Sequence, residues 1–177
     1  GLIERHGQVT VEPSTDPFHQ FVISIVNQSI STAAARSIRA DLFDQFGKPL
    51  TPASVLEANV DALADVLGSQ KAEYVKNAAR RFSGEDFTPA GMAGISDETV
   101  IEELTDIRGV GRWTAEMYLI FVLGREDVFP IGDLAVRRGM EALYGEMTRE
   151  EMVEKADDWQ PYRSYATKYI WADYESE

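Results

Sequence analysis

Apolar residues recur along this chain at the spacing of an α-helix. Ala35, Ile38, Leu42 and Phe46 fall three or four positions apart and share one face of a predicted helix, which Gly47 ends. The alternation of apolar and polar residues that marks a half-buried strand is nearly absent. The pattern therefore predicts an all-α protein.

Residues that start and stop helices divide the chain into elements of ordinary length. Pro17, Thr32 and Pro52 each follow a capping residue and begin a predicted helix. We expect these helices to form one domain spanning 1–177, built as a two-lobed bundle with a cleft between the lobes. The remaining helices are predicted over 69–81, 96–104, 112–123 and 133–144, from the capping box at Thr148, and after Pro161.

One segment, 104–115 (LTDIRGVGRWTA), combines a glycine-rich turn with the start of a helix. Gly109 and Gly111 can adopt positive φ without steric cost, so both are expected to let backbone N–H groups converge at the turn. The helix that follows presents its own unpaired N–H donors at the same place. Such a site suits a DNA phosphate, so the sequence predicts a helix-hairpin-helix motif over about 104–123.

A single carboxylate follows about twenty residues later, in the segment 129–138 (FPIGDLAVRR). Asp133 precedes an apolar helical run, so taken alone it is interpreted as an N-cap that satisfies backbone N–H groups. A helix N-terminus also favours an ionised carboxylate, which is the form that stabilises a positively charged sugar. A phosphate-binding hairpin followed by a lone acid indicates an enzyme that acts on nucleic acid.

Composition limits the class of protein. The 177 residues are 44% hydrophobic, which is enough for a sizeable core, and the absence of cysteine excludes disulfides and cysteine-bound zinc or iron–sulfur clusters. The sequence contains no apolar run of about 18 residues and no signal-peptide pattern. A cytoplasmic protein with no membrane partner is therefore the expectation.

The net charge of −13 argues against DNA binding, but local charge matters more than the total within a Debye length of about 8 to 10 Å. An acid-rich surface with only five lysines is typical of salt-loving organisms. Because salt weakens phosphate contacts, the hairpin N–H groups are expected to matter more than ion pairs. The basic residues expected to offset the acids locally are Lys71, Lys76, Arg80, Arg81, Arg108, Arg112, Arg137 and Arg138.

Three further stretches stand beside the hairpin and the Asp133 segment, at 17–31, 68–74 and 159–166. Together and in this order, the five segments resemble the helix-hairpin-helix DNA glycosylase superfamily, of the 3-methyladenine DNA glycosylase II type. The resemblance covers most of the chain. It implies hydrolysis of the N-glycosidic bond of alkylated purines in duplex DNA, which begins base excision repair, with no organic cofactor.

The resemblance implies that Asp133 is the catalytic residue, acting as an ionised carboxylate beside the sugar of a flipped nucleotide. Trp113 stands where members that also cut the strand carry a lysine that forms a Schiff base. An indole cannot do this, so water is the expected nucleophile and an abasic site the product. Trp113, Tyr162 and Phe18 are expected to form the base pocket, because aromatic faces attract a cationic base. Met117 stands where some members carry another aromatic residue.

The resemblance also implies DNA contacts. Gln28, Ser29 and Ile30 match a short loop that fills the gap left by the flipped base. Ser29 departs from the commoner glutamine or leucine, so Ile30 is an alternative wedge. The other residues expected at the DNA are Lys71, Gly109, Val110, Gly111, Arg112 and Thr114.

A monovalent cation, Na⁺ or K⁺, is implied at the hairpin through the backbone carbonyls of Thr105, Ile107 and Val110. No catalytic metal is expected. His6 and His19 are not spaced as a ligand pair and are interpreted as lone surface histidines.

Glu73 and Glu116 are the alternative acids, but both lie within predicted helices and are interpreted as surface charges. The expected partner is double-stranded DNA containing alkylated bases, bound by a monomer that is nucleoid-associated in a prokaryote. Two alternatives stay open. One is a glycosylase of the same superfamily for uracil, mismatched thymine or oxidised purine, and the other is a helix-hairpin-helix DNA-binding module without catalysis.

Overall fold

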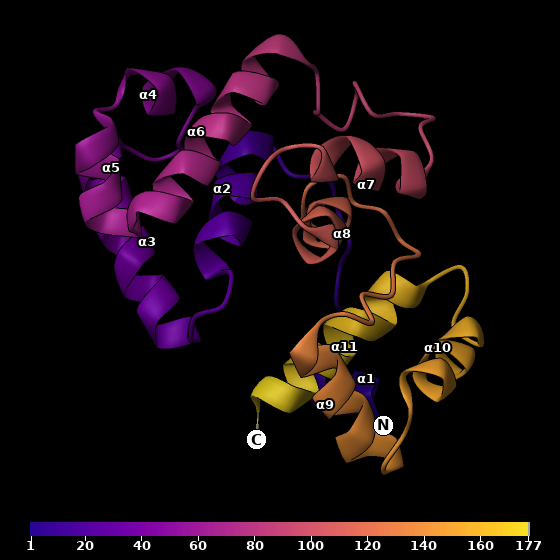
Figure 1. The fold of residues 1–177 in the computed structure, drawn as a ribbon. Helices are drawn as coiled ribbons and strands as arrows, with labels where there is room; N and C mark the ends of the chain where they lie inside the picture. The colour runs from indigo at the N-terminus through magenta and orange to yellow at the C-terminus, as the bar shows by residue number, and fades with distance from the viewer. Residues whose placement is uncertain (177) are drawn as a thin grey trace.

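A computed structural model describes residues 1–176, and within them the chain is entirely helical, with eleven helices and no strand. Figure 1 shows these helices gathered in two lobes. The all-α class and the two-lobed arrangement predicted from the sequence are confirmed. The larger lobe contains α2 (Pro17–Asn27), α3 (Thr32–Phe46), α4 (Pro52–Glu57), α5 (Val60–Leu67), α6 (Ser69–Gly84), α7 (Asp97–Thr105) and α8 (Arg112–Phe121). The smaller lobe contains α1 (Leu2–His6), α9 (Leu134–Tyr144), α10 (Arg149–Asp157) and α11 (Arg163–Glu175).

Each lobe has its own apolar core, which explains the division. In the larger lobe the ring of Phe82 packs against those of Phe21, Phe87 and Tyr118, with centroids 4.8 to 5.9 Å apart. In the smaller lobe the fully buried residues are fewer and come from α9, α10 and α11. They are Val136, Met140, Met152 and Ile170.

The predicted helix starts agree with the structure, while some ends and two helices do not. α8 ends at Phe121 rather than at 123, because the N–H groups of Val122 and Leu123 both donate to the Tyr118 carbonyl. α6 continues past Arg81 to Gly84. The short helices α1 and α5 were not predicted from the sequence.

The chain passes between the lobes twice, and the two crossings, 7–16 and 122–133, lie side by side (Figure 1). The Ser14 N–H donates to the Val122 carbonyl at 2.8 Å. Gly124 has φ +64°, and a Cβ there would overlap the backbone of the first crossing. Close contact between the crossings therefore fixes how the lobes face each other.

The second crossing is also fastened to α11. The Ser164 hydroxyl donates to the Arg125 carbonyl at 2.6 Å and accepts the Val128 N–H at 2.9 Å. Arg163 Nε donates to Asp127 Oδ1 at 2.8 Å, and this hydrogen bond lowers the pKa of Asp127. These contacts hold the chain that leads to Asp133 against the smaller lobe.

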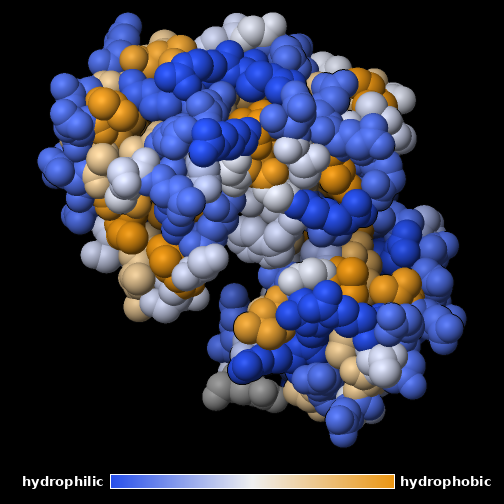
Figure 2. Space-filling view, viewed as in Figure 1, coloured by the Kyte–Doolittle hydropathy of each residue, from blue (hydrophilic) through white to orange (hydrophobic). Residues whose placement is uncertain are grey.

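Figure 2 shows a notch on the molecular surface where the lobes meet, under a largely hydrophilic face of the larger lobe. None of the helices described combines the length and the apolar character needed to span a membrane.

Candidate functional site

The backbone conformation of the hairpin between α7 and α8 requires glycine at position 109 but not at position 111. Gly109 has φ +97°, and a Cβ there would collide with the ring of Tyr74. Gly111 has φ −96° and ψ −179°, which any residue adopts, so the predicted positive φ at this position is wrong. A Cβ on Gly111 would meet no atom within 4 Å. The lack of a side chain at Gly111 therefore leaves open space on the hairpin surface and is not needed to relieve backbone strain.

The loop after α2 is tied directly to the hairpin. Gln28 Nε2 donates to the Gly109 carbonyl at 3.2 Å and to Thr114 Oγ1 at 2.8 Å. Lys71 Nζ donates to the carbonyls of Val26 and Gln28, both at 2.7 Å. Gln28, Thr114 and Lys71 were each predicted to face DNA, but their side chains serve to position this loop. Burial also lowers the pKa of Lys71.

The tip of this loop faces outward. Ser29 is exposed and has φ +58°, a left-handed conformation that is uncommon for a residue other than glycine. Ile30 is half-buried and lines the hollows on both sides of the loop. The structure thus brings both candidate wedge residues to the same opening.

Asp133 caps α9, as predicted, and its carboxylate makes two further hydrogen bonds. Oδ2 accepts the Val136 N–H and Trp171 Nε1–H, both at 2.9 Å, and Oδ1 accepts Trp113 Nε1–H at 2.6 Å. The two indoles come from different lobes, α8 and α11. The carboxylate is therefore held in one orientation by three donors on three helices, and it remains half-buried rather than sealed.

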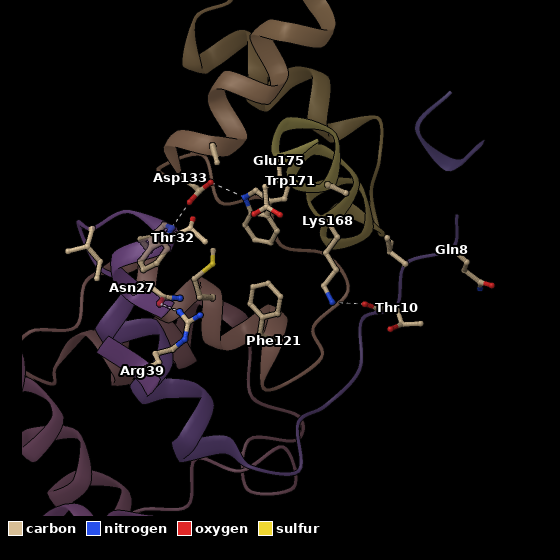
Figure 3. A pocket seen from close by; sticks show the side chains of 17 residues that line it. Gln8, Thr10, Asn27, Thr32, Arg39, Phe121, Asp133, Lys168, Trp171 and Glu175 are labelled. Carbon is tan, nitrogen blue, oxygen red and sulfur yellow. Dashed lines mark hydrogen bonds between the residues drawn. The ribbon is translucent and has the colours of Figure 1, made fainter. Parts of the chain in front are cut away.

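Two hollows meet at Asp133. One has a volume of about 790 Å³ and extends between the lobes, where Figure 3 shows Asp133, Trp171 and Phe121 around it. The other, also about 790 Å³, lies beneath the hairpin and the loop of residues 28–31. Four residues line both hollows: Asn27, Ile30, Trp113 and Asp133.

Much of the wall of the hollow between the lobes consists of single faces of α3, α8 and α11, since their lining residues recur three or four positions apart. Such a wall is built by the periodicity of each helix, so the hollow is a property of the helix packing. The main contributors are Thr32, Ala35 and Arg39 of α3, Trp113, Met117 and Phe121 of α8, Asp133 and Ala135 of the α9 start, and Lys168, Trp171, Ala172 and Glu175 of α11.

Two of the three predicted base-pocket residues lie elsewhere. Phe18 is 6% exposed and packs on the ring of Phe82 in the core of the larger lobe, because it falls on the buried face of α2. Tyr162 is 56% exposed and contacts Tyr165, since it precedes α11 at the end away from Asp133. Only Trp113 lines the hollow as predicted.

Trp171 is the aromatic residue that the sequence reasoning missed. Its ring stacks on Phe121 with centroids 5.5 Å apart and planes 16° from parallel, and its N–H reaches Asp133. Nothing in the local sequence distinguishes Trp171 from a core tryptophan. Its position 38 residues after Asp133 becomes meaningful only when α11 packs against α9.

Much of the predicted positive charge is neutralised within the protein. Arg112 pairs with Glu98 at 2.7 Å, Arg81 with Asp106 at 2.9 Å and Arg108 with Glu73 at 3.5 Å. Lys76 donates to the carbonyls of Leu56 and Ala58. Arg138 differs from these residues, since it is exposed and forms no ion pair within residues 1–176.

Glu116 and His19 are not surface groups, contrary to the predictions. Glu116 is 5% exposed, and burial raises its pKa to about 7. His19 is 5% exposed, its Nδ1 accepts the Leu50 N–H at 3.1 Å, and burial lowers its pKa. Both lie on inward faces of their helices, which their isolated sequence positions did not reveal. His6 is not a lone surface histidine either, because its Nε2 lies 3.0 Å from Asp173 Oδ1 and its side chain is 17% exposed. Glu73 is half exposed, as expected for a surface acid.

The three carbonyls predicted to hold a monovalent cation lie at the hairpin. The Ile107 carbonyl accepts the Val110 N–H at 3.0 Å and keeps one lone pair. Among residues 1–176, no cluster of three or more histidine or acidic side chains is placed to hold a metal ion.

Comparison with known proteins identifies the family. The family model described as HhH-GPD superfamily base excision DNA repair protein matches residues 22–161. The alkylbase DNA glycosidase-like protein of Schizosaccharomyces pombe is 30% identical over 185 residues, which cover 96% of this chain and 84% of that protein. A solved DNA-3-methyladenine glycosidase from Bacillus halodurans superposes with a TM-score of 0.82 at 33% identity, covering 98% of this chain and 82% of that one. The S. pombe 3-methyladenine DNA glycosylase in complex with abasic DNA superposes with a TM-score of 0.84 at 27% identity, covering 96% and 87% of the two chains. The chain therefore belongs to the HhH-GPD superfamily of base excision DNA repair proteins.

Proposed function

We propose that this protein is a monofunctional DNA glycosylase that hydrolyses the N-glycosidic bond of alkylated purines in duplex DNA and so begins base excision repair. The observation that carries the proposal is the Asp133 carboxylate, fixed by two indole N–H groups where two hollows meet. The names of the related proteins, which are 3-methyladenine and alkylbase glycosylases, support this substrate class.

The geometry suits charge stabilisation. Cleavage of an N-glycosidic bond passes through an oxocarbenium-like state, and an ionised acid close to C1′ lowers the energy of that state. Because Val136, Trp113 and Trp171 already orient both oxygens of Asp133, little reorganisation is needed as the charge develops. An alkylated purine already carries positive charge and leaves as a neutral base, so a second acid to protonate it is dispensable.

The arrangement of the hollows gives a path for the base. A duplex base must leave the stack before its glycosidic bond becomes accessible. The hollow beneath the hairpin opens beside Ser29 and Ile30, where a wedge would separate the neighbouring bases. The flipped base then enters the hollow between the lobes, with Trp113 and the Trp171–Phe121 stack as aromatic walls.

We propose that the DNA backbone binds at the hairpin through N–H groups of residues 109 and 111–114, which the open space at Gly111 leaves accessible. A Na⁺ or K⁺ ion held by the carbonyls of Thr105, Ile107 and Val110 would bridge this hairpin to a phosphate. Both contacts rely less on ion pairs than a basic surface would, which suits a chain of net charge −13.

We propose that the protein does not cut the DNA strand. Trp113 occupies the hairpin position where a lysine would form a Schiff base, and its N–H is bound to Asp133. We expect borohydride to trap no covalent adduct between the protein and lesion-containing DNA. A trapped adduct would place the chain among the strand-cutting members instead.

The direct test is to incubate the protein with methylated duplex DNA at low and at high salt and to identify the released bases by chromatography. Release of methylated purines with an intact DNA strand is the expected result. Binding to abasic DNA without release of any base would instead indicate a DNA-binding module without catalysis.

A further inference from the structure

One wall of the hollow between the lobes is polar, although the other walls are rich in aromatic residues. Arg39 is half-buried on the face of α3 that lines the hollow. Its Nη1 donates to Asn27 Oδ1 at 2.6 Å. Figure 3 shows the two side chains next to each other, across the hollow from Lys168.

This pair presents more hydrogen-bond donors than acceptors. Arginine has five N–H donors, and within residues 1–176 Arg39 uses one of them and has no carboxylate within 4 Å. Asn27 Oδ1 accepts one hydrogen bond from Arg39 and keeps one lone pair, while both N–H donors of its NH₂ remain. The guanidinium and this amide therefore offer N–H groups to any molecule in the hollow.

The pair lies where a flipped base would arrive. Asn27 lines both hollows together with Trp113 and Asp133, so it lies at their junction. Trp171 and Phe121 provide stacked aromatic rings on the other side of the same hollow. A base whose sugar is beside Asp133 and whose ring lies against these aromatics would direct an edge toward Asn27 and Arg39.

We propose that Asn27 and Arg39 determine which bases are accepted, favouring purines with a carbonyl oxygen at position 6 over purines with an amino group there. A carbonyl accepts from the guanidinium or the amide. An amino group can donate only to the remaining lone pair of Asn27 Oδ1, and the guanidinium then faces a donor and gains no partner at that position. Arg39 also raises the cost of any positive charge on the base, equally for both classes. The inference rests on the proposed function and names the substrate preference of that site.

The test compares two bases released in one reaction. Duplex DNA treated with dimethyl sulfate carries 7-methylguanine, with a 6-carbonyl group, and 3-methyladenine, with a 6-amino group. In Arg39→Met, which keeps an unbranched, flexible side chain but no donor, release of 7-methylguanine should fall roughly ten- to a hundredfold relative to 3-methyladenine. Arg39→Lys should keep part of the preference. Arg36→Met, an exposed arginine on the same helix outside the hollow, should keep the wild-type ratio.

An unchanged ratio of the two released bases in Arg39→Met would overturn the inference, even if both release rates fell together.

A second experiment measures binding of the free bases and does not require catalysis. Two of the three tryptophans line the hollow, so free 7-methylguanine and 3-methyladenine can be titrated by tryptophan fluorescence. The wild-type protein should bind 7-methylguanine about tenfold more tightly, and equal affinities would contradict the inference. If the wild-type protein released neither base, the proposed function would fail, and this titration would still decide the preference.

Discussion

Glu116 gives the protein a pH-dependent stability that can be calculated from its surroundings. Burial raises the pKa of Glu116 from 4.5 to about 7, against the attraction of Arg112, whose Nε lies 3.9 Å from Oε2. Between these two pH values the folded protein holds a proton that the unfolded chain releases. This contribution is present in full below pH 4.5 and is lost as the pH rises to about 7.

The difference of about 2.5 pKa units corresponds to about 3 kcal/mol of unfolding free energy. Glu116→Gln replaces the acid with a neutral side chain of the same shape. At about pH 8.5 we expect the variant to be more stable than the wild-type protein by up to about 3 kcal/mol, or about 6 to 12 °C in Tm. At about pH 4.5 the two proteins should have nearly equal stability.

The assay is thermal and urea unfolding followed by circular dichroism across this pH range, with the two proteins compared at each pH. Glu102→Gln, which changes an exposed acid on α7, is the control and should differ from the wild-type protein by less than about 0.5 kcal/mol at every pH. A stability difference for Glu116→Gln that does not vary with pH would refute the reasoning.

Two further predictions concern the hairpin and the loop beside it. Gly109→Ala should lower the unfolding free energy by at least about 1 to 3 kcal/mol, because alanine is strained at φ +97° and its Cβ would collide with the Tyr74 ring. Gly111→Ala should leave the unfolding free energy nearly unchanged, because its Cβ meets no atom. The same variant should bind abasic DNA about tenfold or more weakly, since the added methyl group occupies the open space at the hairpin N–H groups. Equal losses of stability in the two variants, measured by urea unfolding, would contradict this account of the hairpin. Lys71→Met should leave the slope of log Kd against log salt unchanged, because Lys71 binds the carbonyls of Val26 and Gln28; a slope reduced by about one would reveal a phosphate contact.

Features set by neighbouring residues could be predicted from the sequence. The cap of α9 by Asp133 and the capping box of Thr148 and Glu151 agree with the structure, because a side chain bonds to N–H groups two or three positions ahead. The start of α8 just after Gly111 was predicted on the same grounds. The position of Asp133 beside the hairpin followed from the order of the two segments in the resemblance.

Features set by the packing of distant helices could not be predicted. The sequence shows that Lys71 is basic and that Phe18 is aromatic, but not that one faces carbonyls of the next loop and the other faces a core. Trp171 and Arg39 join the site only because α11 and α3 approach it from opposite lobes. Glu116 follows the same rule, since its burial depends on what packs against α8.

The central claim is that the Asp133 carboxylate stabilises positive charge on the sugar of a flipped nucleotide. Asp133→Asn keeps a residue that caps α9 and removes the negative charge. The most direct measurement is the single-turnover rate of base release by this variant, beside its affinity for abasic DNA. We predict a rate at least about a hundredfold lower with affinity within about threefold of the wild-type value. Base release at close to the wild-type rate would contradict the account.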